Sequence, residues 1–122
     1  MIFKVFQEVN AERAKLWHHS GVRQWGLVDW TNATAGEAGE LCNAAKKLQR
    51  LHDGIDGNKG ETQAELEQAV AEEMADTITY AFLVGSHLGV DVGEELIKKF
   101  NAVSERNGFY IGLEEEEDDD DG

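Results

Sequence analysis

The stretch TQAELEQAVAEEMADTITYAFLVGSH, residues 62–87, decides the fold that we predict for this chain. Its apolar residues recur at helical spacing, and its second half is apolar on nearly every side. A helix of that kind belongs at the centre of a fold. Because the chain contains no proline, such a helix can run unbroken. The sequence therefore predicts a long central helix over residues 62–87.

Apolar residues at helical spacing predict three further helices, over residues 3–20, from residues 31–34 to residue 51, and over residues 92–105. Leu16 and Trp17 belong to the apolar face of the first, which Gly21 is expected to end. Asp91 is expected to cap the last. No segment predicts a strand. The fold class is thus all-α, a compact bundle of four main helices over residues 1–110.

The charge of the chain is concentrated at its C-terminal end. The formal net charge is −14, and eight consecutive acids, residues 114–121, account for more than half of it. A run of like charges repels itself, so residues 111–122 are predicted to be an acidic disordered tail. Mimicry of nucleic acid, or binding of a basic partner, is the functional alternative for this tail. Because the remainder is also acidic, binding to nucleic acid is disfavoured.

Cysteine content and hydropathy indicate the compartment. Cys42 is the only cysteine, which excludes an intrachain disulfide. No basic segment followed by an apolar stretch is present, and the longest uncharged run, residues 77–90, is too short and too polar to span a bilayer. We therefore expect a cytoplasmic protein with no membrane partner.

Two pairs of acids are candidates for a metal site. Glu37 with Glu40, and Glu73 with Asp76, are each three residues apart, so each pair lies on one face of a helix. Both pairs continue the apolar stripe of their helix, which predicts that they point inward. Carboxylates that face a core need a cation or hydrogen bonds. Ligation by oxygen alone favours Mg²⁺, with Mn²⁺ as a substitute.

Two simpler interpretations of these acids remain open. Thr34 and Glu37 fit the spacing of a capping box at a helix start. Glu40 and Lys47, or Glu73 with a neighbouring base, could form surface ion pairs that stabilise little.

Around these residues the sequence resembles the MazG-like family of all-α nucleoside triphosphate pyrophosphohydrolases. The resemblance rests on GEAGEL, which holds Glu37 and Glu40, on EEMADTITY, which holds Glu73 and Asp76, and on the later segment KKFNAVSERNGF. It covers about residues 25–109. It implies cleavage of a nucleoside triphosphate between the α and β phosphates, with Mg²⁺ held by the four carboxylates. It also implies a homodimer or homotetramer in which neighbouring subunits complete the pocket.

The same resemblance implies phosphate-binding residues on the fourth helix, namely Lys98, Asn101 and Arg106. Cationic side chains suit an anionic triphosphate. The alternative is that these cations are solvated and favoured only by the negative end of the helix dipole.

Aromatic residues are candidates for stacking on the nucleobase, because an aromatic face accepts any base. We assign this role to Trp17, His18, Trp30 and Tyr80. Core packing is the alternative for each tryptophan.

Together these patterns predict an Mg²⁺-dependent enzyme that converts a (d)NTP to a (d)NMP and pyrophosphate and so cleans the nucleotide pool. The first alternative is a hydrolase similar to phosphoribosyl-ATP pyrophosphohydrolase. The second is a non-catalytic helical interaction protein that uses its acidic tail.

Overall fold

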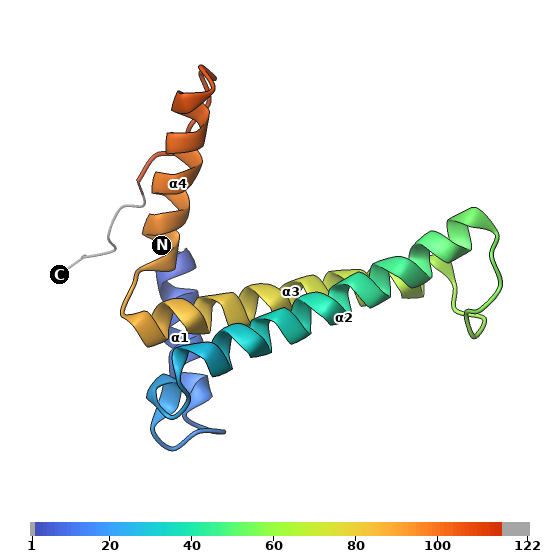
Figure 1. Ribbon diagram of the computed structural model, residues 1–122, viewed down its shortest axis with the longest axis horizontal. Coiled ribbons are helices and arrows are strands. Elements are labelled where there is room, and N and C mark those ends of the chain that lie inside the picture. The colour runs from blue at the N-terminus through green and yellow to red at the C-terminus, as the bar shows by residue number, and fades with distance from the viewer. Residues whose placement is uncertain (1, 116–122) are drawn as a thin grey trace. The chain divides into compact units, whose positions relative to one another are not determined.

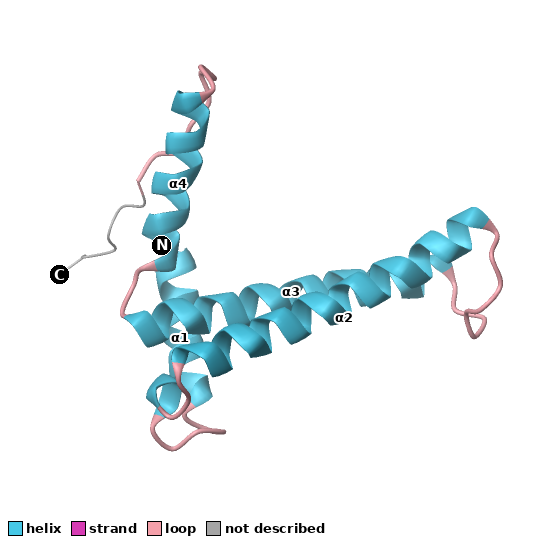
Figure 2. Cartoon of the chain, in the orientation of Figure 1, coloured by secondary structure: helices cyan, strands magenta, loops and turns pink. Residues whose placement is uncertain are grey.

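The computed structural model describes residues 2–115, and all regular structure in this part of the chain is helical (Figure 1, Figure 2). The all-α prediction is therefore confirmed. The elements are α1 (Ile2–Ala14), the short 3-10 helix η1 (Gly21–Arg23), α2 (Leu27–Asp53), α3 (Gln63–Leu88) and α4 (Val92–Arg106). Among the described residues, no helix has both the length and the apolar composition needed to cross a bilayer. Most of the predicted acidic tail, residues 116–122, lies outside the described residues.

The described residues group into two compact units. One unit holds residues 2–24 and 82–115, and the other holds residues 25–81. The boundary between them falls within α3, so each unit is described by itself below.

Helix α3 agrees with its prediction to within one residue at each end. Thr62 caps it, because the hydroxyl of Thr62 accepts a hydrogen bond from the backbone N–H of Glu65 at 3.2 Å and donates one to the Glu65 carboxylate at 3.1 Å. At the other end Gly89 adopts a φ of +72°, and Val90 N–H donates to the carbonyl of Gly85 at 2.9 Å. This backbone geometry closes the helix in a Schellman motif.

The first helix is shorter than predicted, and its predicted apolar face is wrong at the C-terminal end. Helix α1 ends at Ala14 because the following N–H groups of Leu16 and Trp17 bond to carbonyls only three residues back. Leu16 and Trp17 are 83% and 67% exposed. His18, His19 and Ser20 are poor helix formers, and the left-handed Gly21 then turns the chain into η1.

The second helix begins earlier than predicted, at Leu27. Asp29, in its first turn, accepts a hydrogen bond from Gly26 N–H at 2.9 Å. The hydroxyls of Thr31 and Thr34 do not cap the helix but donate back to the carbonyls of Val28 and Trp30, at 3.1 and 2.9 Å. These threonines are therefore interior helix residues.

An aromatic cluster forms the core of the unit that contains α1 and α4. The ring of Phe82 lies 4.9 Å from that of Phe6, edge to face, and 6.1 Å from that of Phe3. Gln7 of α1 joins the turn before α4, since its side chain donates to Val90 O at 2.7 Å and accepts from Val92 N–H at 2.9 Å. This pairing satisfies two backbone groups that the turn leaves without partners.

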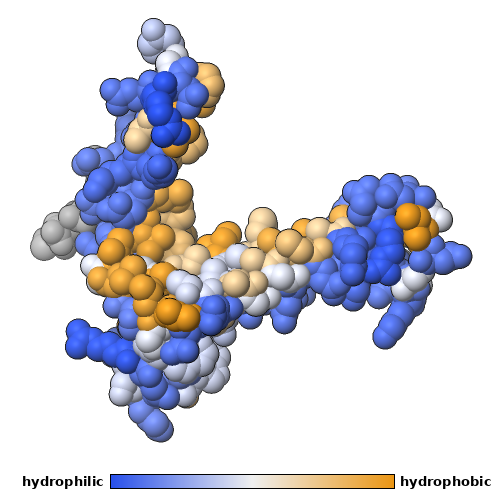
Figure 3. Space-filling model, in the orientation of Figure 1, coloured by the Kyte–Doolittle hydropathy of each residue, from blue (hydrophilic) through white to orange (hydrophobic). Residues whose placement is uncertain are grey.

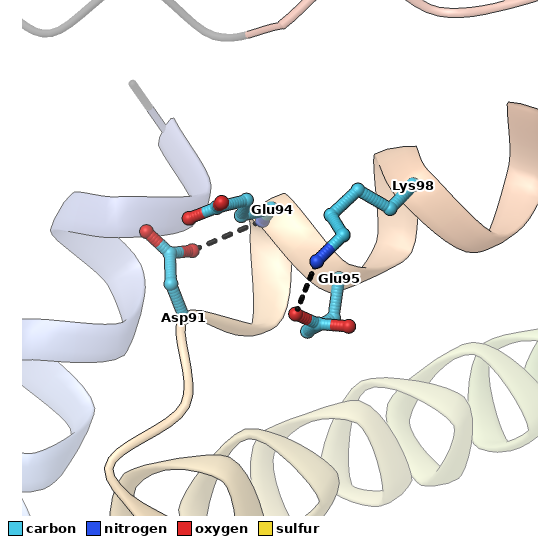
Figure 4. Close-up of polar contacts among 4 residues, drawn as sticks. All are labelled: Asp91, Glu94, Glu95 and Lys98. Atoms are coloured by element: carbon cyan, nitrogen blue, oxygen red, sulfur yellow. Dashed lines mark hydrogen bonds and ion pairs between the residues drawn. The ribbon is translucent and has the colours of Figure 1, made fainter.

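Helix α4 starts where the sequence predicts. The carboxylate of Asp91 accepts a hydrogen bond from Glu94 N–H at 3.0 Å, as Figure 4 shows. Ile97 and Ser104 of α4 are buried, so the face that carries them packs against the rest of this unit.

Residues 25–81 form an antiparallel hairpin of α2 and α3 (Figure 1). Trp30 of α2 is 1% exposed, and its ring centroid lies 4.6 Å from that of Trp25 and 6.4 Å from that of Tyr80 on α3. Ala44 and Leu66 are the other apolar residues of the described hairpin that are buried. In Figure 3 apolar surface follows one edge of the hairpin, and the loop end is hydrophilic apart from one small apolar patch.

Gly85→Ala should destabilise the protein by about 1–3 kcal/mol, because an added Cβ would overlap the side chain of Val92. Gly36→Ala is the control, since its added Cβ would have no atom within 4 Å apart from its chain neighbours and the adjacent backbone of its own helix. Alanine at this helical position should stabilise by about 0.5–1 kcal/mol. Urea unfolding measures both. Equal effects of the two substitutions would contradict the packing described for Gly85.

Candidate functional site

Three carboxylates meet between α2 and α3. One carboxylate oxygen from each of Glu37, Glu73 and Asp76 lies within 4.8 Å of the other two. Glu37 projects from α2, and Glu73 and Asp76, one turn apart, project from α3. Glu37 and Glu73 are half-buried and Asp76 is exposed, so solvent reaches the cluster. The structure thus brings together three of the four acids that the sequence singled out.

The register of the hairpin explains this meeting. Trp30 and Tyr80 pack against each other across the two helices. Glu37 follows Trp30 by seven residues, and Glu73 precedes Tyr80 by seven, which is two helical turns in each case. Because the helices are antiparallel, the two glutamates arrive at the same level of the hairpin. The aromatic contact therefore sets the position of the carboxylates.

The cluster is electrostatically unfavourable as it stands. Burial raises the pKa of Glu37, and the charges of Glu40 and Asp76 raise it further. Burial also raises the pKa of Glu73, together with the charges of Glu40, Asp76 and Glu37. The Oε2 atom of Glu73 is buried and has no hydrogen-bond partner among the described residues. A buried carboxylate oxygen without a partner is costly.

Glu40, the fourth predicted ligand, is exposed and lies outside the group of three. It remains close enough for its charge to raise the pKa of both Glu37 and Glu73. Glu40 is therefore a negative charge beside the cluster and not one of its three close carboxylates.

The structure decides between the simpler interpretations of these acids. The capping box of Thr34 and Glu37 is wrong, because α2 begins at Leu27 and the Thr34 hydroxyl bonds to Trp30 O. Within residues 2–115, no ion pair joins Glu40 to Lys47, and no base neutralises Glu73.

The aromatic candidates differ in accessibility. Trp30 is a core residue with no exposed face for a base, as the packing alternative predicts. Tyr80 is half-buried beside it. Trp17, 67% exposed, carries the guanidinium of Arg13 over its ring at 5.4 Å, and His18 next to it is half-buried. Trp25, another candidate for stacking on a base, lies with its ring 4.6 Å from that of Trp30. Because Trp25 precedes α2, helical spacing gives no sign of this contact.

The predicted phosphate-binding residues lie on α4, in the unit that holds residues 82–115. Lys98 is exposed and pairs with Glu95, Nζ to Oε1, at 3.2 Å (Figure 4). The amide of Asn101 bonds to the backbone of Leu113 through both its oxygen and its nitrogen. Arg106 is the basic residue of the last turn of α4. These roles stay predictions.

The chain was compared with models of known families, with curated proteins and with solved structures, and it matches none of them.

We expect Glu73→Gln to stabilise the metal-free protein at neutral pH. The raised pKa values of Glu37 and Glu73 mean that the folded state binds protons more tightly than the unfolded state. The free energy of unfolding contributed by these two groups should therefore rise as the pH falls toward the ordinary glutamate pKa, about 4.3, and be constant below it.

The check is the difference in the free energy of unfolding between variant and wild type from pH 8 to pH 4, measured with chelator. This difference should favour the variant at pH 8 and shrink as the pH falls. Glu72→Gln, a neighbouring exposed position with the same charge change, should show no such trend. A Glu73→Gln variant less stable than wild type at pH 8 would contradict the charge repulsion described.

Proposed function

We propose that this chain is an Mg²⁺-dependent nucleoside triphosphate pyrophosphohydrolase, similar to the MazG-like enzymes, that converts a (d)NTP to a (d)NMP and pyrophosphate. The observation that carries the proposal is the meeting of Glu37, Glu73 and Asp76 within 4.8 Å of one another across the α2 and α3 hairpin. The acids come from the two motifs, GEAGEL and EEMADTITY, on which the family resemblance rests.

The donor set fits a hard divalent cation. All three close ligands are carboxylates, and the cluster contains no histidine or cysteine. The buried Oε2 atom of Glu73 lacks a partner, and a cation would supply one. Burial, and after it the neighbouring negative charges, raise the pKa of Glu37 and Glu73, and a dication would offset those charges. Exposed Asp76 leaves a side of the site open for substrate.

Glu37, Glu73 and Asp76 would hold the ion, and Glu40 would add negative charge beside them. The bound ion would supply neutralisation of the charge that develops on the departing pyrophosphate. In the reaction, a water oxygen bonds to the α-phosphorus, and the bond from this phosphorus to the oxygen that bridges the α and β phosphates breaks. The bridging oxygen leaves with the pyrophosphate. A carboxylate of the cluster would orient this water and accept its proton. Glu37 and Glu73 are the candidates, because both are half-buried and have raised pKa values.

A homodimer or homotetramer is part of the proposal. The described hairpin buries only Trp30, Ala44 and Leu66 among its apolar residues. Met74 and Ile78, one turn apart on α3, are 50% and 47% exposed. A second copy packed on this face would remove that apolar surface from water.

Pyrophosphate release from a panel of dNTPs, NTPs and phosphoribosyl-ATP tests the activity. Wild type should release pyrophosphate only with Mg²⁺ or Mn²⁺. Glu73→Gln should lower kcat/KM at least about 100-fold, because a metal ligand contributes several kcal/mol to the transition state. Glu72→Gln is the control and should remain active.

Calorimetry with Mg²⁺ alone separates loss of the ion from loss of chemistry, because Glu73→Gln should weaken the titration that wild type shows. Release of orthophosphate in place of pyrophosphate, or equal activity of Glu73→Gln and wild type, would overturn the proposal. Turnover of phosphoribosyl-ATP alone would select the first alternative enzyme.

Ile78→Glu should shift the oligomer toward the monomer in sedimentation velocity, because it places a charge on the apolar face of α3. Gln63→Glu, in the exposed first turn of α3, adds the same charge and should leave the distribution unchanged. A monomeric wild type at tens of micromolar would contradict the proposed assembly.

A further inference from the structure

After α4 the chain folds back along its own helix in a short segment, residues 108–113, which we call the strap. Gly108 adopts a φ of +70°, and the N–H that follows it donates to a carbonyl of the last turn of α4 at 2.9 Å. At the other end of the strap, Asn101 Nδ2 donates to Leu113 O at 2.8 Å, and Asn101 Oδ1 accepts from Leu113 N–H at 2.7 Å. The backbone of the strap is therefore held at both ends.

Between these two anchors lies a pocket of about 320 Å³. Phe109, Tyr110 and Ile111 of the strap line one part of it, and Ser104 and Glu105 of α4 line another. Sites for small molecules begin at about 300 Å³ and combine apolar walls with a few polar groups. At roughly 30 Å³ for each, this pocket has room for about ten non-hydrogen atoms. Because the strap is anchored, a ligand does not have to order its backbone.

Two polar groups of α4 at this pocket have no partner within residues 2–115. The hydroxyl of Ser104, a residue that is only 7% exposed, makes no hydrogen bond there. The carboxylate of Glu105 forms neither an ion pair nor a hydrogen bond in the same part of the chain. No lysine, arginine or histidine is among the described residues that line the pocket. The pocket thus presents a free hydroxyl and an uncompensated negative charge.

The strap supplies the apolar surface of the pocket. Phe109 and Ile111 are 61% and 65% exposed, and Tyr110 is fully exposed, so a ligand can cover all three side chains. The faces of aromatic rings attract cations. A neutral ligand would leave the carboxylate of Glu105 unpaired, and an anionic ligand would be repelled by it. The combination therefore favours a ligand that carries a positive charge on an apolar body.

We infer that the pocket between the strap and α4 binds a small organic ammonium ion. The ammonium group donates hydrogen bonds to Glu105 and Ser104, and the apolar body lies against the exposed side chains of the strap. A free amine is favoured over a lysine of another protein, because the four-carbon chain and ammonium of lysine fill only about half of the pocket. The binding uses no metal and no residue of the hairpin, so it is independent of the proposed enzymatic activity.

Titration of the full chain with phenethylamine, followed by amide NMR at neutral pH with chelator, tests the inference. The shifts should concentrate at Ser104 and in the strap, with a Kd in the millimolar range. Phenylethanol, a neutral molecule of the same shape, should bind at least about fivefold more weakly because it lacks the charge. Acetyllysine amide, acetylated on its α-nitrogen, should also bind at least about fivefold more weakly because it covers less of the strap.

Three variants separate the charge of the pocket from its apolar wall. Glu105→Gln should weaken phenethylamine about fivefold and leave phenylethanol within about twofold, because only the charge is lost. Ile111→Ser should weaken both molecules at least about threefold, because it removes apolar contact surface. Glu94→Gln, the matched control, makes the same charge change at an exposed position in the first turn of α4 and should alter neither affinity.

Equal affinity of phenethylamine and phenylethanol for wild type would overturn the inference. Equal effects of Glu105→Gln and Glu94→Gln would do the same, because the amine would then follow only the net charge of the chain. Shifts that leave the strap unchanged would place the amine elsewhere and would contradict the assigned pocket. An acetyllysine amide that binds as tightly as phenethylamine would assign the pocket to a protein side chain and would also refute the proposal.

Discussion

The contact of Trp30 with Tyr80 is the constraint on which the candidate site depends. Trp30 is the most deeply buried apolar residue of the described hairpin, and its contact with Tyr80 sets the register of α2 against α3. A shift by one helical turn, about 5.4 Å, would move Glu37 away from its present level with Glu73. The aromatic residues near the site thus act first through packing. Their effect on the chemistry is to set the distance between carboxylates on different helices.

The hairpin places stability and function in opposition. Glu37, Glu73 and Asp76 meet at one level of the two helices with Glu40 beside them. Burial and the neighbouring charges raise the pKa of Glu37 and Glu73, and a buried oxygen of Glu73 has no partner among the described residues. Such an arrangement destabilises the metal-free chain. The apolar residues buried in the described hairpin are few. A ligand that binds the folded hairpin and not the unfolded chain is expected to raise the free energy of unfolding.

Three helices end in the same way, with a left-handed glycine followed by an apolar residue. Gly54, Gly89 and Gly108 have φ values of +66°, +72° and +70°, and Ile55, Val90 and Phe109 each donate to a carbonyl of the last turn. In two cases the motif connects one helix to the next. After α4 the motif instead turns the chain back along its own helix, where the side-chain amide of Asn101 bonds to the backbone of Leu113. An ordinary helix end therefore leaves Phe109, Tyr110 and Ile111 exposed.

Helical periodicity, caps and i, i+3 spacing are local properties, so the sequence was enough to predict the all-α class, α3 and α4 almost to the residue, and three acids that meet in the structure, Glu37, Glu73 and Asp76. It misplaced the end of α1 and the start of α2. Shortly before His18, backbone N–H groups bond to carbonyls three residues back, and the hydroxyls of Thr31 and Thr34 donate to carbonyls within their own helix. The spacing of apolar residues indicates neither feature. Three features follow from packing alone: Trp30 is core, Glu40 lies beside the other three acids, and Asn101 binds Leu113. Each of these depends on which helix faces which, or on how the chain returns after a helix, and contacts of that kind leave no periodic signal in the sequence.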